Sequence, residues 1–187
     1  GRRARQKGVP FTPKGLFQHQ TVQALAAVAT CGDSVIRIDQ GPVSGTLALL
    51  PVQQLFFAEA IPERHQWNQS VQLQTRLSLD AGLLEQALRA LTHHHDALRL
   101  AFVEDAQGWS ASYRTPAQAD AQTLLWSVRA SEVADLPALY EQAQRSPDLS
   151  AGPVLRAVLV DGEDGSHRLL LVIHHLVVDG VSWRVLL

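Results

Sequence analysis

The sequence predicts an α/β fold for the larger part of the chain, with a mixed sheet and helices packed against it in two layers. From residue 47 onward, stretches with the alternating or continuous apolar pattern of strands interleave with stretches of helical periodicity. The chain has 187 residues, of which 46% are hydrophobic and 18% are charged, and this balance is typical of a folded protein with a buried core.

The first thirty residues carry two helix starts and form the first predicted unit, residues 1–30. Thr12 with Pro13 offers an N-cap followed by proline in the first turn, and Thr21 can cap a second helix that ends near Ala29. The apolar stripe of the second helix is too short to fold alone, so this unit is expected to belong to something larger that lies upstream.

Residues 31–46 are expected to be a linker, with a domain boundary near residue 40. They contain three glycines and one proline and show no sustained periodicity. The second predicted unit is therefore residues 47–187.

The expected elements of the second unit alternate between strand and helix. Residues 67–79 alternate apolar and polar side chains, as a half-buried strand does, and Asp80 caps a helix over 80–93. The remaining candidates before residue 150 are short strands over 98–103, 109–114 and 123–128, and a second helix over 132–145.

The strands over 154–160 and 168–173 are richest in valine and leucine, which indicates that they lie in the centre of the sheet. Gly-Glu-Asp-Gly at residues 162–165 predicts a hairpin between them. Both long helices are expected to pack on one face of this sheet. Residues 181–187 begin a helix without glycine, asparagine or proline to stop it, so the sequence is expected to be interrupted within an element.

Composition excludes several classes of function. The net charge of −2 and the pI near 6.5 give no broad positive field for nucleic acid or an anionic membrane. Cys31 is the only cysteine, so no intramolecular disulfide or zinc-thiolate cluster can form. No run approaches the roughly 20 apolar residues that a membrane helix needs. We expect a soluble, cytoplasmic protein with no metal site and no nucleic-acid or membrane partner.

The most informative stretch is the end of the apolar run 169–173, where His174 and His175 are followed by Asp179 and Gly180. Side chains alternate along a strand, so the two histidines should point to opposite sides and cannot easily share one task. A histidine pair by itself is more often structural than catalytic, and too few further ligands lie nearby for a metal.

With its spacing to Asp179 and Gly180, the pair matches the H-H-x-x-x-D-G signature of the condensation superfamily. This superfamily includes chloramphenicol acetyltransferase and the condensation, epimerisation and heterocyclisation domains of nonribosomal peptide synthetases. Three further stretches resemble motifs of these domains in the family's order, namely residues 50–57, 95–99 and 148–156. The resemblance implies a chloramphenicol acetyltransferase-like lobe for residues 47–187.

Residues 11–22 resemble the end of a carrier, or thiolation, domain, so the resemblance implies that residues 1–30 are its last helices. The serine that bears the carrier's 4'-phosphopantetheine would then lie upstream of Gly1, and no cofactor is expected to bind this chain directly. The implied partners are neighbouring carrier and synthetase domains and a carrier-bound aminoacyl or peptidyl thioester.

Within the superfamily, residues 65–70 and 177–184, and Trp183 above all, look like epimerisation domains more than like peptide-bond-forming ones. The implied reaction is L-to-D epimerisation at the α carbon of the carrier-bound thioester. Two alternatives remain open. One is a condensation domain that forms peptide bonds, and the other is a catalytically silent docking domain.

By the resemblance, His175 is the catalytic histidine that exchanges a proton with the α carbon. His174 is expected to hold the loop by hydrogen bonds. The family's usual partner, a glutamate in a second lobe, would lie beyond Leu187, so this chain alone is expected to be inactive.

Other residues near the pair are expected to support it. Asp179 can accept hydrogen bonds from backbone amides or pair with Arg99 or Arg156. Gly180 is expected to supply a backbone conformation, or a close approach, that a side chain would block. Ser182 opens the next helix beside Trp183, and its hydroxyl either donates into a cleft or faces solvent.

Overall fold

The computed structural model describes residues 9, 12–29, 39 and 41–187. It divides into two compact units, residues 1–41 and residues 42–187, which are described separately. Cys31 and most of the predicted linker lie outside the described residues.

The first unit contains two short helices, α2 (Pro13–Gln18) and α3 (Val22–Val28). The Thr12 hydroxyl accepts a hydrogen bond from the Gly15 amide at 3.0 Å, and the Thr21 hydroxyl accepts one from the Ala24 amide at 3.1 Å. Both predicted helix starts are therefore confirmed. No residue of α3 is buried, and Val22 is 86% exposed, so the described part of this unit leaves the apolar stripe uncovered.

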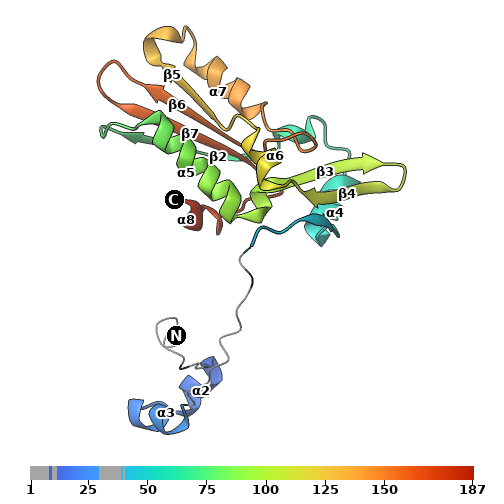
Figure 1. Ribbon diagram of the computed structural model, residues 1–187, viewed down its shortest axis with the longest axis vertical. Helices are drawn as coiled ribbons and strands as arrows, with labels where there is room; N and C mark the ends of the chain where they lie inside the picture. Colours follow the sequence, from blue (N-terminus) through green and yellow to red (C-terminus); the bar gives the residue numbers. More distant parts are fainter. Residues whose placement is uncertain (1–8, 10–11, 30–38, 40) are drawn as a thin grey trace. The chain divides into compact units, whose positions relative to one another are not determined.

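The second unit contains two sheets with helices around them (Figure 1). The four-stranded sheet has the order β2-β7-β6-β5 and consists of β2 (Asn68–Thr75), β5 (Leu125–Arg129), β6 (Leu155–Asp161) and β7 (His167–His174). The three-stranded sheet has the order β1-β4-β3 and consists of β1 (Gly45–Leu47), β3 (Leu100–Asp105) and β4 (Gly108–Tyr113). The helices are α4 (Pro51–Ala58), α5 (Ala81–His94), α6 (Pro116–Asp120), α7 (Leu136–Gln144) and α8 (Trp183–Leu186), with single-turn helices η1 (Arg64–Gln66), η2 (Asp96–Arg99) and η3 (Ala130–Glu132).

The hairpin of β6 and β7 forms the centre of the larger sheet. The two strands pair antiparallel, with Leu159 opposite Leu169, while β5 runs parallel to β6 and β2 runs antiparallel to β7. Nearly every residue of β6 and most of β7 are buried. The mixed sheet, the central position of these strands and the hairpin between them are therefore confirmed.

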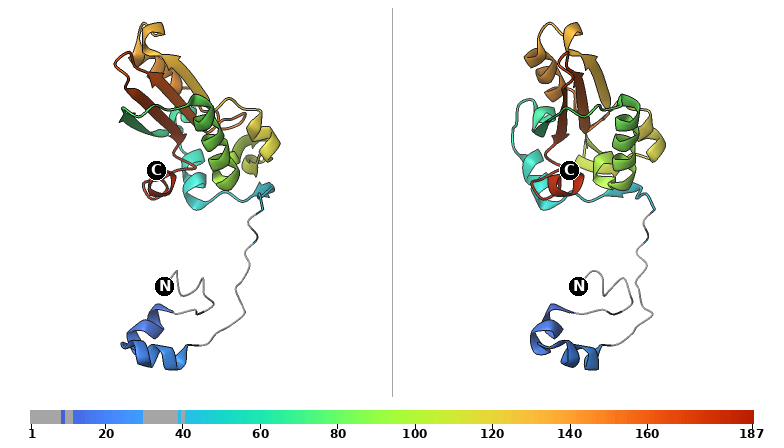
Figure 2. Two further views of the ribbon diagram at one scale, coloured as in Figure 1. Left: turned by 60° about the vertical axis from the view of Figure 1, so that its left-hand side comes forward. Right: turned by 90° about the vertical axis from the view of Figure 1, so that its left-hand side faces the viewer.

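The two long helices cover opposite faces of this sheet, so the expectation that they share one face was wrong. On one face, Leu88 of α5 joins a core with Ala157 and Leu171. On the other face, Ala143 of α7 joins a core with Val158 and Val172. Because both faces of the central hairpin are apolar, each needs its own cover to keep water away. Figure 2 shows the sheet between the two helices in its right-hand view.

Several boundaries also differ from those predicted. Residues 96–99 form a turn of 3-10 helix, so the strand predicted from residue 98 begins only at Leu100. The second helix begins at residue 136, because Asp135 caps it and Pro137 occupies its first turn. Strand β2 ends at Thr75 rather than near residue 79. Gly45 and Thr46, assigned to the linker by composition, belong to β1 and pair with β4.

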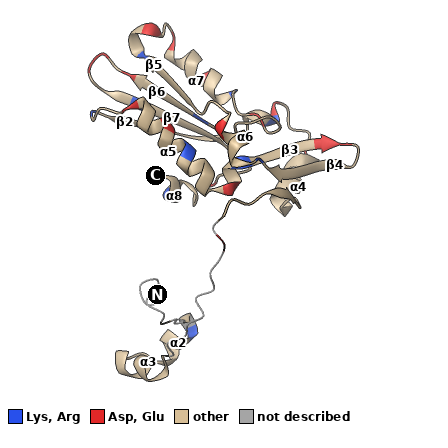
Figure 3. Cartoon of the chain, in the orientation of Figure 1, with Lys and Arg blue, Asp and Glu red and all other residues tan. Residues whose placement is uncertain are grey.

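The described residues contain neither a long apolar helix nor a concentration of charge of one sign. Among them, no helix is long and apolar enough to cross a membrane. Basic and acidic residues are spread over many elements of the second unit, as Figure 3 shows, and no single helix or strand described in this unit gathers the basic ones. This distribution agrees with the net charge of −2.

We predict that Ile173→Ala destabilises the protein by about 2 to 5 kcal/mol, the usual cost of a cavity left by a large core side chain. Ile173 is 1% exposed and belongs to the core under α5. The matched control is Leu83→Ala, because Leu83 lies in α5 and is 66% exposed. Chemical denaturation measures both variants. Equal stability of Ile173→Ala and the parent protein would mean that β7 is not part of the core.

Candidate functional site

The backbone at the end of β7 is held from both sides. The His174 amide donates to the Val154 carbonyl at 3.0 Å, next to the start of β6, and the His175 amide donates to the Trp67 carbonyl at 2.8 Å, next to the start of β2. Consecutive amides that bond to opposite neighbours are the pattern of a strand in the middle of a sheet, so the alternation of β7, which ends at His174, still applies to the next residue, His175. Their side chains consequently leave on opposite faces.

The imidazole of His174 is fully buried and has a partner at each ring nitrogen. Its Nε2 lies 2.8 Å from the Arg64 carbonyl of η1, which can only accept, and its Nδ1 accepts a hydrogen bond from the Leu176 amide at 3.2 Å. This pattern requires a neutral ring with the proton on Nε2. The ring also makes an edge contact with Phe56, with 5.8 Å between the ring centroids.

Burial lowers the pKa of His174 to about 4, because desolvation penalises the charged ring. The hydrogen bond to Arg64 opposes this shift, while the nearby His65 and His175 add to it. His174 is therefore a neutral structural group that fastens η1 to the end of β7.

His175 points to the other face and is exposed. Its Nδ1 lies 3.0 Å from the Val178 carbonyl, and since a carbonyl can only accept, Nδ1 must carry the proton of the neutral ring. The lone pair is then on Nε2, which lies 3.1 Å from the side-chain nitrogen of Gln69. The outward nitrogen of His175 is thus a potential base.

The loop after the histidines is organised by the side chain of Asp179. Its Oδ1 accepts hydrogen bonds from the Val181 amide at 3.0 Å, the Ser182 amide at 2.8 Å and the Ser182 hydroxyl at 2.7 Å. The bonds from the Ser182 hydroxyl and amide lower the pKa of Asp179, and the proximity of His175 lowers it slightly further. Asp179 therefore has one of its two expected roles, because its carboxylate accepts hydrogen bonds from backbone amides.

The other expected role of Asp179, an ion pair with Arg99 or Arg156, is not formed. The buried Arg99 pairs with Asp96 and donates to the Thr92 carbonyl at 2.9 Å. Arg156 donates to the Ser146 hydroxyl at 2.9 Å and lies 4.6 Å from the Trp126 ring centroid. Both arginines therefore bond to neighbouring backbone and side-chain groups instead of Asp179. The side chain of Arg156 lies on the face of β6 that α7 covers.

The expectations for Gly180 and Ser182 need correction as well. Gly180 does not adopt a positive φ, and a Cβ at this position would meet no atom within 4 Å, so no side chain is excluded here. The Ser182 hydroxyl donates to Asp179 rather than into a cleft or to solvent. The loop is shaped by the hydrogen bonds that Val181 and Ser182 donate to the Asp179 carboxylate.

Gln69 is a site residue that sequence reasoning missed. Its side-chain oxygen accepts a hydrogen bond from the indole nitrogen of Trp183 at 2.9 Å, and its side-chain nitrogen faces His175. Gln69 lies on β2 opposite Ile173 and has the same alternation parity as Val71. The alternation along β2 can be seen in the sequence. It places Gln69 beside His175 only once the pairing of β2 with β7 is known.

A cavity of about 530 Å³ opens beside His175. The residues that line it come from β1, α4, the start of β3, the end of β4 and the loop after β7, and most are apolar. His175, Asp179 and Ser182 are among its polar residues. The outward face of the histidine loop therefore borders a largely apolar space of a size that can hold a small organic group.

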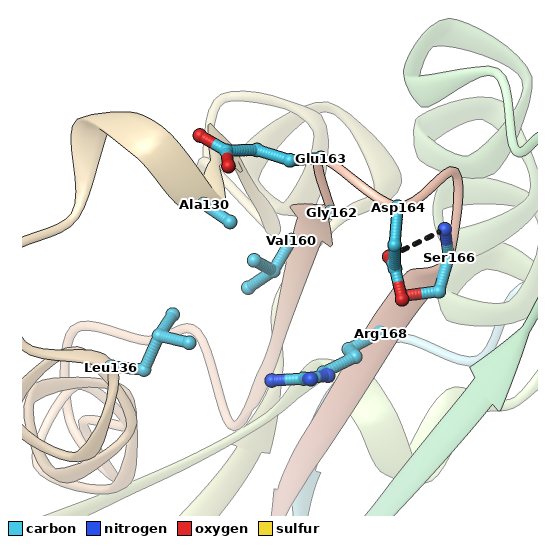
Figure 4. A pocket seen from close by; sticks show the side chains of 8 residues that line it. All are labelled: Ala130, Leu136, Val160, Gly162, Glu163, Asp164, Ser166 and Arg168. Carbon is cyan, nitrogen blue, oxygen red and sulfur yellow. Dashed lines mark hydrogen bonds between the residues drawn. The ribbon is translucent and has the colours of Figure 1, made fainter.

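A second cavity, of about 360 Å³, lies beside the turn between β6 and β7 (Figure 4). Its Asp164 carboxylate accepts hydrogen bonds from the Ser166 amide at 3.0 Å and the Ser166 hydroxyl at 2.6 Å, so this polar group serves the turn. Among the described residues, no group of three or more His, Cys, Asp or Glu side chains is placed to hold a metal ion.

The larger unit is similar to a known protein family. A family model described as "Condensation domain" matches residues 43–187. A linear gramicidin synthase from Brevibacillus parabrevis is 43% identical, and surfactin synthase subunit 1 from Bacillus subtilis (strain 168) is 40% identical, each over 99% of this chain. This chain spans only 4% and 5% of the length of these two relatives.

Solved structures show the same fold. The epimerization domain from the third module of tyrocidine synthetase B matches with a TM-score of 0.72 and 38% identity, covering 80% of this chain and 34% of that domain. The starter condensation domain of rhizomide synthetase matches with a TM-score of 0.60 and 23% identity, covering 76% of this chain and 35% of that one. At such identity the second match concerns the fold alone.

We predict that the protein loses stability between pH 6.5 and pH 4 because of His174. In this range the unfolded chain binds a proton at His174 and the folded chain does not, so the free energy of unfolding falls as the pH falls, by up to about 3 kcal/mol for a pKa lowered from 6.5 to about 4. His174→Gln removes the titrating ring and should flatten this part of the pH profile. Urea denaturation at several pH values compares it with the parent and with His93→Gln, an exposed control. Profiles of His174→Gln and the parent with the same slope would contradict the assignment of a buried neutral ring.

We also predict that Asp179→Ala loosens the loop after β7, because three hydrogen bonds to Asp179 Oδ1 are lost. Amide hydrogen exchange at Val181 and Ser182 should become severalfold faster. Gly180→Ala is the control and should leave both exchange rates unchanged, since a Cβ there meets open space. Slow exchange in Asp179→Ala would show that other contacts hold the loop.

Proposed function

Because the chain belongs to the condensation-domain family, we propose that its larger unit is part of an epimerisation domain of a nonribosomal peptide synthetase. The complete domain would convert the α carbon of a carrier-bound aminoacyl or peptidyl thioester from L to D by proton transfer. The level of similarity to known domains supports the epimerisation type. Identity to the tyrocidine synthetase B epimerization domain is 38%.

The single observation that carries the proposal is the state of His175. The ring is exposed, its Nδ1 proton is bonded to the Val178 carbonyl, and its Nε2 lone pair faces the side-chain nitrogen of Gln69 at 3.1 Å. A neutral imidazole in this state can accept a proton near neutral pH. His174 serves the fold instead, because both of its ring nitrogens are bonded inside the protein.

In the proposed reaction, Nε2 of His175 takes the α proton. The α C–H bond breaks, and its electron pair moves into the thioester carbonyl, which makes the proton removable. A group on the opposite side of the α carbon returns a proton to the other face. The family resemblance assigns that task to a glutamate of a second lobe, and the cavity of about 530 Å³ next to His175 provides room for the aminoacyl group.

We propose that residues 1–30 are the last helices of the carrier domain that presents the substrate. The relatives match 99% of this chain, which includes the residues before the family model begins at residue 43. The thioester would be formed with 4'-phosphopantetheine on that carrier, and the partners would be the neighbouring carrier and synthetase domains. A cytoplasmic location fits these partners and a sequence with a single cysteine, which can form no intramolecular disulfide.

A condensation domain is the second candidate, because the matching family model carries that description and the histidine motif is common to both types. The two candidates differ in what the reaction consumes. Epimerisation exchanges the α proton of one thioester with water, whereas condensation joins two carrier-bound groups. A single loaded carrier without an acceptor therefore distinguishes them.

We predict that His175→Ala slows the loss of α deuterium from a carrier-bound aminoacyl thioester by about 10²- to 10⁴-fold, the usual contribution of a positioned base. The assay uses a domain of full family length that contains this segment, with its preceding carrier, and mass spectrometry follows the deuterium. His94→Ala is the control, because His94 is exposed at the end of α5, away from the cavity. Wild-type exchange in a folded His175→Ala variant would show that another residue is the base. Absence of exchange in the parent, together with peptide formation once an acceptor is added, would favour condensation.

A further inference from the structure

We infer that Gln69 is a positioning residue for His175, and that Trp183 fixes the direction in which the Gln69 amide points. The three side chains form one chain of hydrogen bonds. The Trp183 indole nitrogen lies 2.9 Å from the Gln69 oxygen, the Gln69 side-chain nitrogen lies 3.1 Å from His175 Nε2, and His175 Nδ1 lies 3.0 Å from the Val178 carbonyl.

The orientation of the Gln69 amide follows from the chemistry of Trp183. An indole N–H can only donate, so the carbonyl end of the amide must face it. The NH₂ end then faces His175. If the amide were reversed, two donors would meet at the indole and the hydrogen bond would be lost.

The proton on His175 is fixed from the other end of the chain. The Val178 carbonyl can only accept, so Nδ1 carries the proton, and Nε2 is free to accept from the Gln69 amide. Each donor in the chain thus meets an acceptor. Only one tautomer of His175 satisfies both neighbours, which is the tautomer with its lone pair on Nε2.

These partners are held by structured segments of the fold. Gln69 lies within β2, where its backbone pairs with Ile173 of β7, and Trp183 begins α8, where its amide donates to the Asp179 carbonyl at 3.2 Å. Both side chains are half-buried, and the hydrogen bond between Trp183 and Gln69 is partly buried, whereas the one between Gln69 and His175 is exposed. The imidazole plane is therefore set by elements on two sides of the histidine loop.

The consequence for proton transfer rests on the proposed function. The substrate's α C–H group and the Gln69 amide compete for the same lone pair, so the substrate displaces this hydrogen bond when Nε2 takes the proton. Once Nε2 is protonated, its N–H faces the amide N–H, and the amide cannot turn without giving up Trp183. Gln69 therefore favours the return of the proton from Nε2, as reversible exchange at the α carbon requires.

The tautomer of His175 can be measured without any assay of activity. Long-range ¹H–¹⁵N spectra of the uniformly ¹⁵N-labelled 187-residue chain distinguish a ring protonated at Nδ1 from one protonated at Nε2. For the neutral ring of His175 in the parent chain we expect the proton on Nδ1. Trp183→Phe removes the indole N–H, so the amide is free to reverse, and we expect a mixture of the two tautomers.

Gln69→Glu provides a second variant of the same shape in case Trp183→Phe does not fold. A carboxylate accepts from the indole and presents a second acceptor to Nε2, so we expect a ring that is protonated on both nitrogens. Trp126→Phe is the control, because Trp126 contacts Arg156 on β6 and should leave the His175 spectrum unchanged. Protonation of Nε2 in the parent chain, or an unchanged His175 spectrum in both Trp183→Phe and Gln69→Glu, would overturn the inference.

A kinetic arm separates this inference from the proposed function. In the domain of full family length, we expect Gln69→Leu to slow α-deuterium loss by up to about 100-fold, the size of effect that misplacement of a catalytic group produces. If the spectra agree with the inference but His175→Ala still exchanges deuterium, the proposed function is wrong and the positioning of His175 stands. If His175→Ala abolishes exchange while the spectra disagree, only the role of Gln69 and Trp183 is wrong.

Discussion

The structure depends on the central hairpin of β6 and β7 being buried on both faces. Because side chains alternate along β7, the strand must supply apolar groups to the cores under α5 and α7 in turn. At its end the same alternation still applies, since the amides of His174 and His175 bond to opposite neighbours. One imidazole is thereby drawn into the protein and the other is turned toward a cavity. The division of labour between two adjacent, chemically identical residues follows from strand geometry.

The two imidazole rings differ in which nitrogen faces a backbone carbonyl. His174 meets the Arg64 carbonyl with Nε2 and remains neutral in its buried position. His175 meets the Val178 carbonyl with Nδ1 and presents its Nε2 to the side-chain nitrogen of Gln69. In both cases a backbone carbonyl selects the tautomer, so the local fold determines which nitrogen can react. The residues that follow the second carbonyl are tied together by hydrogen bonds to the Asp179 carboxylate.

Local patterns in the sequence predicted much of this arrangement, and contacts distant in sequence account for what they missed. The turn at residues 162–165, the cap at Asp80 and the opposite directions of the two histidines are all properties of neighbouring residues. The cover of both sheet faces and the role of Gln69 depend on which strands pair. Gln69 and His175 are 106 positions apart, and no pattern within β2 or β7 alone connects them. Gly180 was misjudged for a different, local reason, because the motif contains a glycine but the adjacent Asp179 side chain shapes the turn.

Chemical modification can show directly whether one histidine is enclosed while the other offers a reactive nitrogen. Diethyl pyrocarbonate acylates accessible imidazole nitrogens that carry a lone pair, and fragmentation in the mass spectrometer can separate His174 from His175. In the folded protein we expect rapid acylation of His175 and protection of His174, whose ring is fully buried with both nitrogens bonded. After unfolding in urea the two should react alike. Equal rates in the folded protein, or faster reaction at His174, would contradict this division of roles.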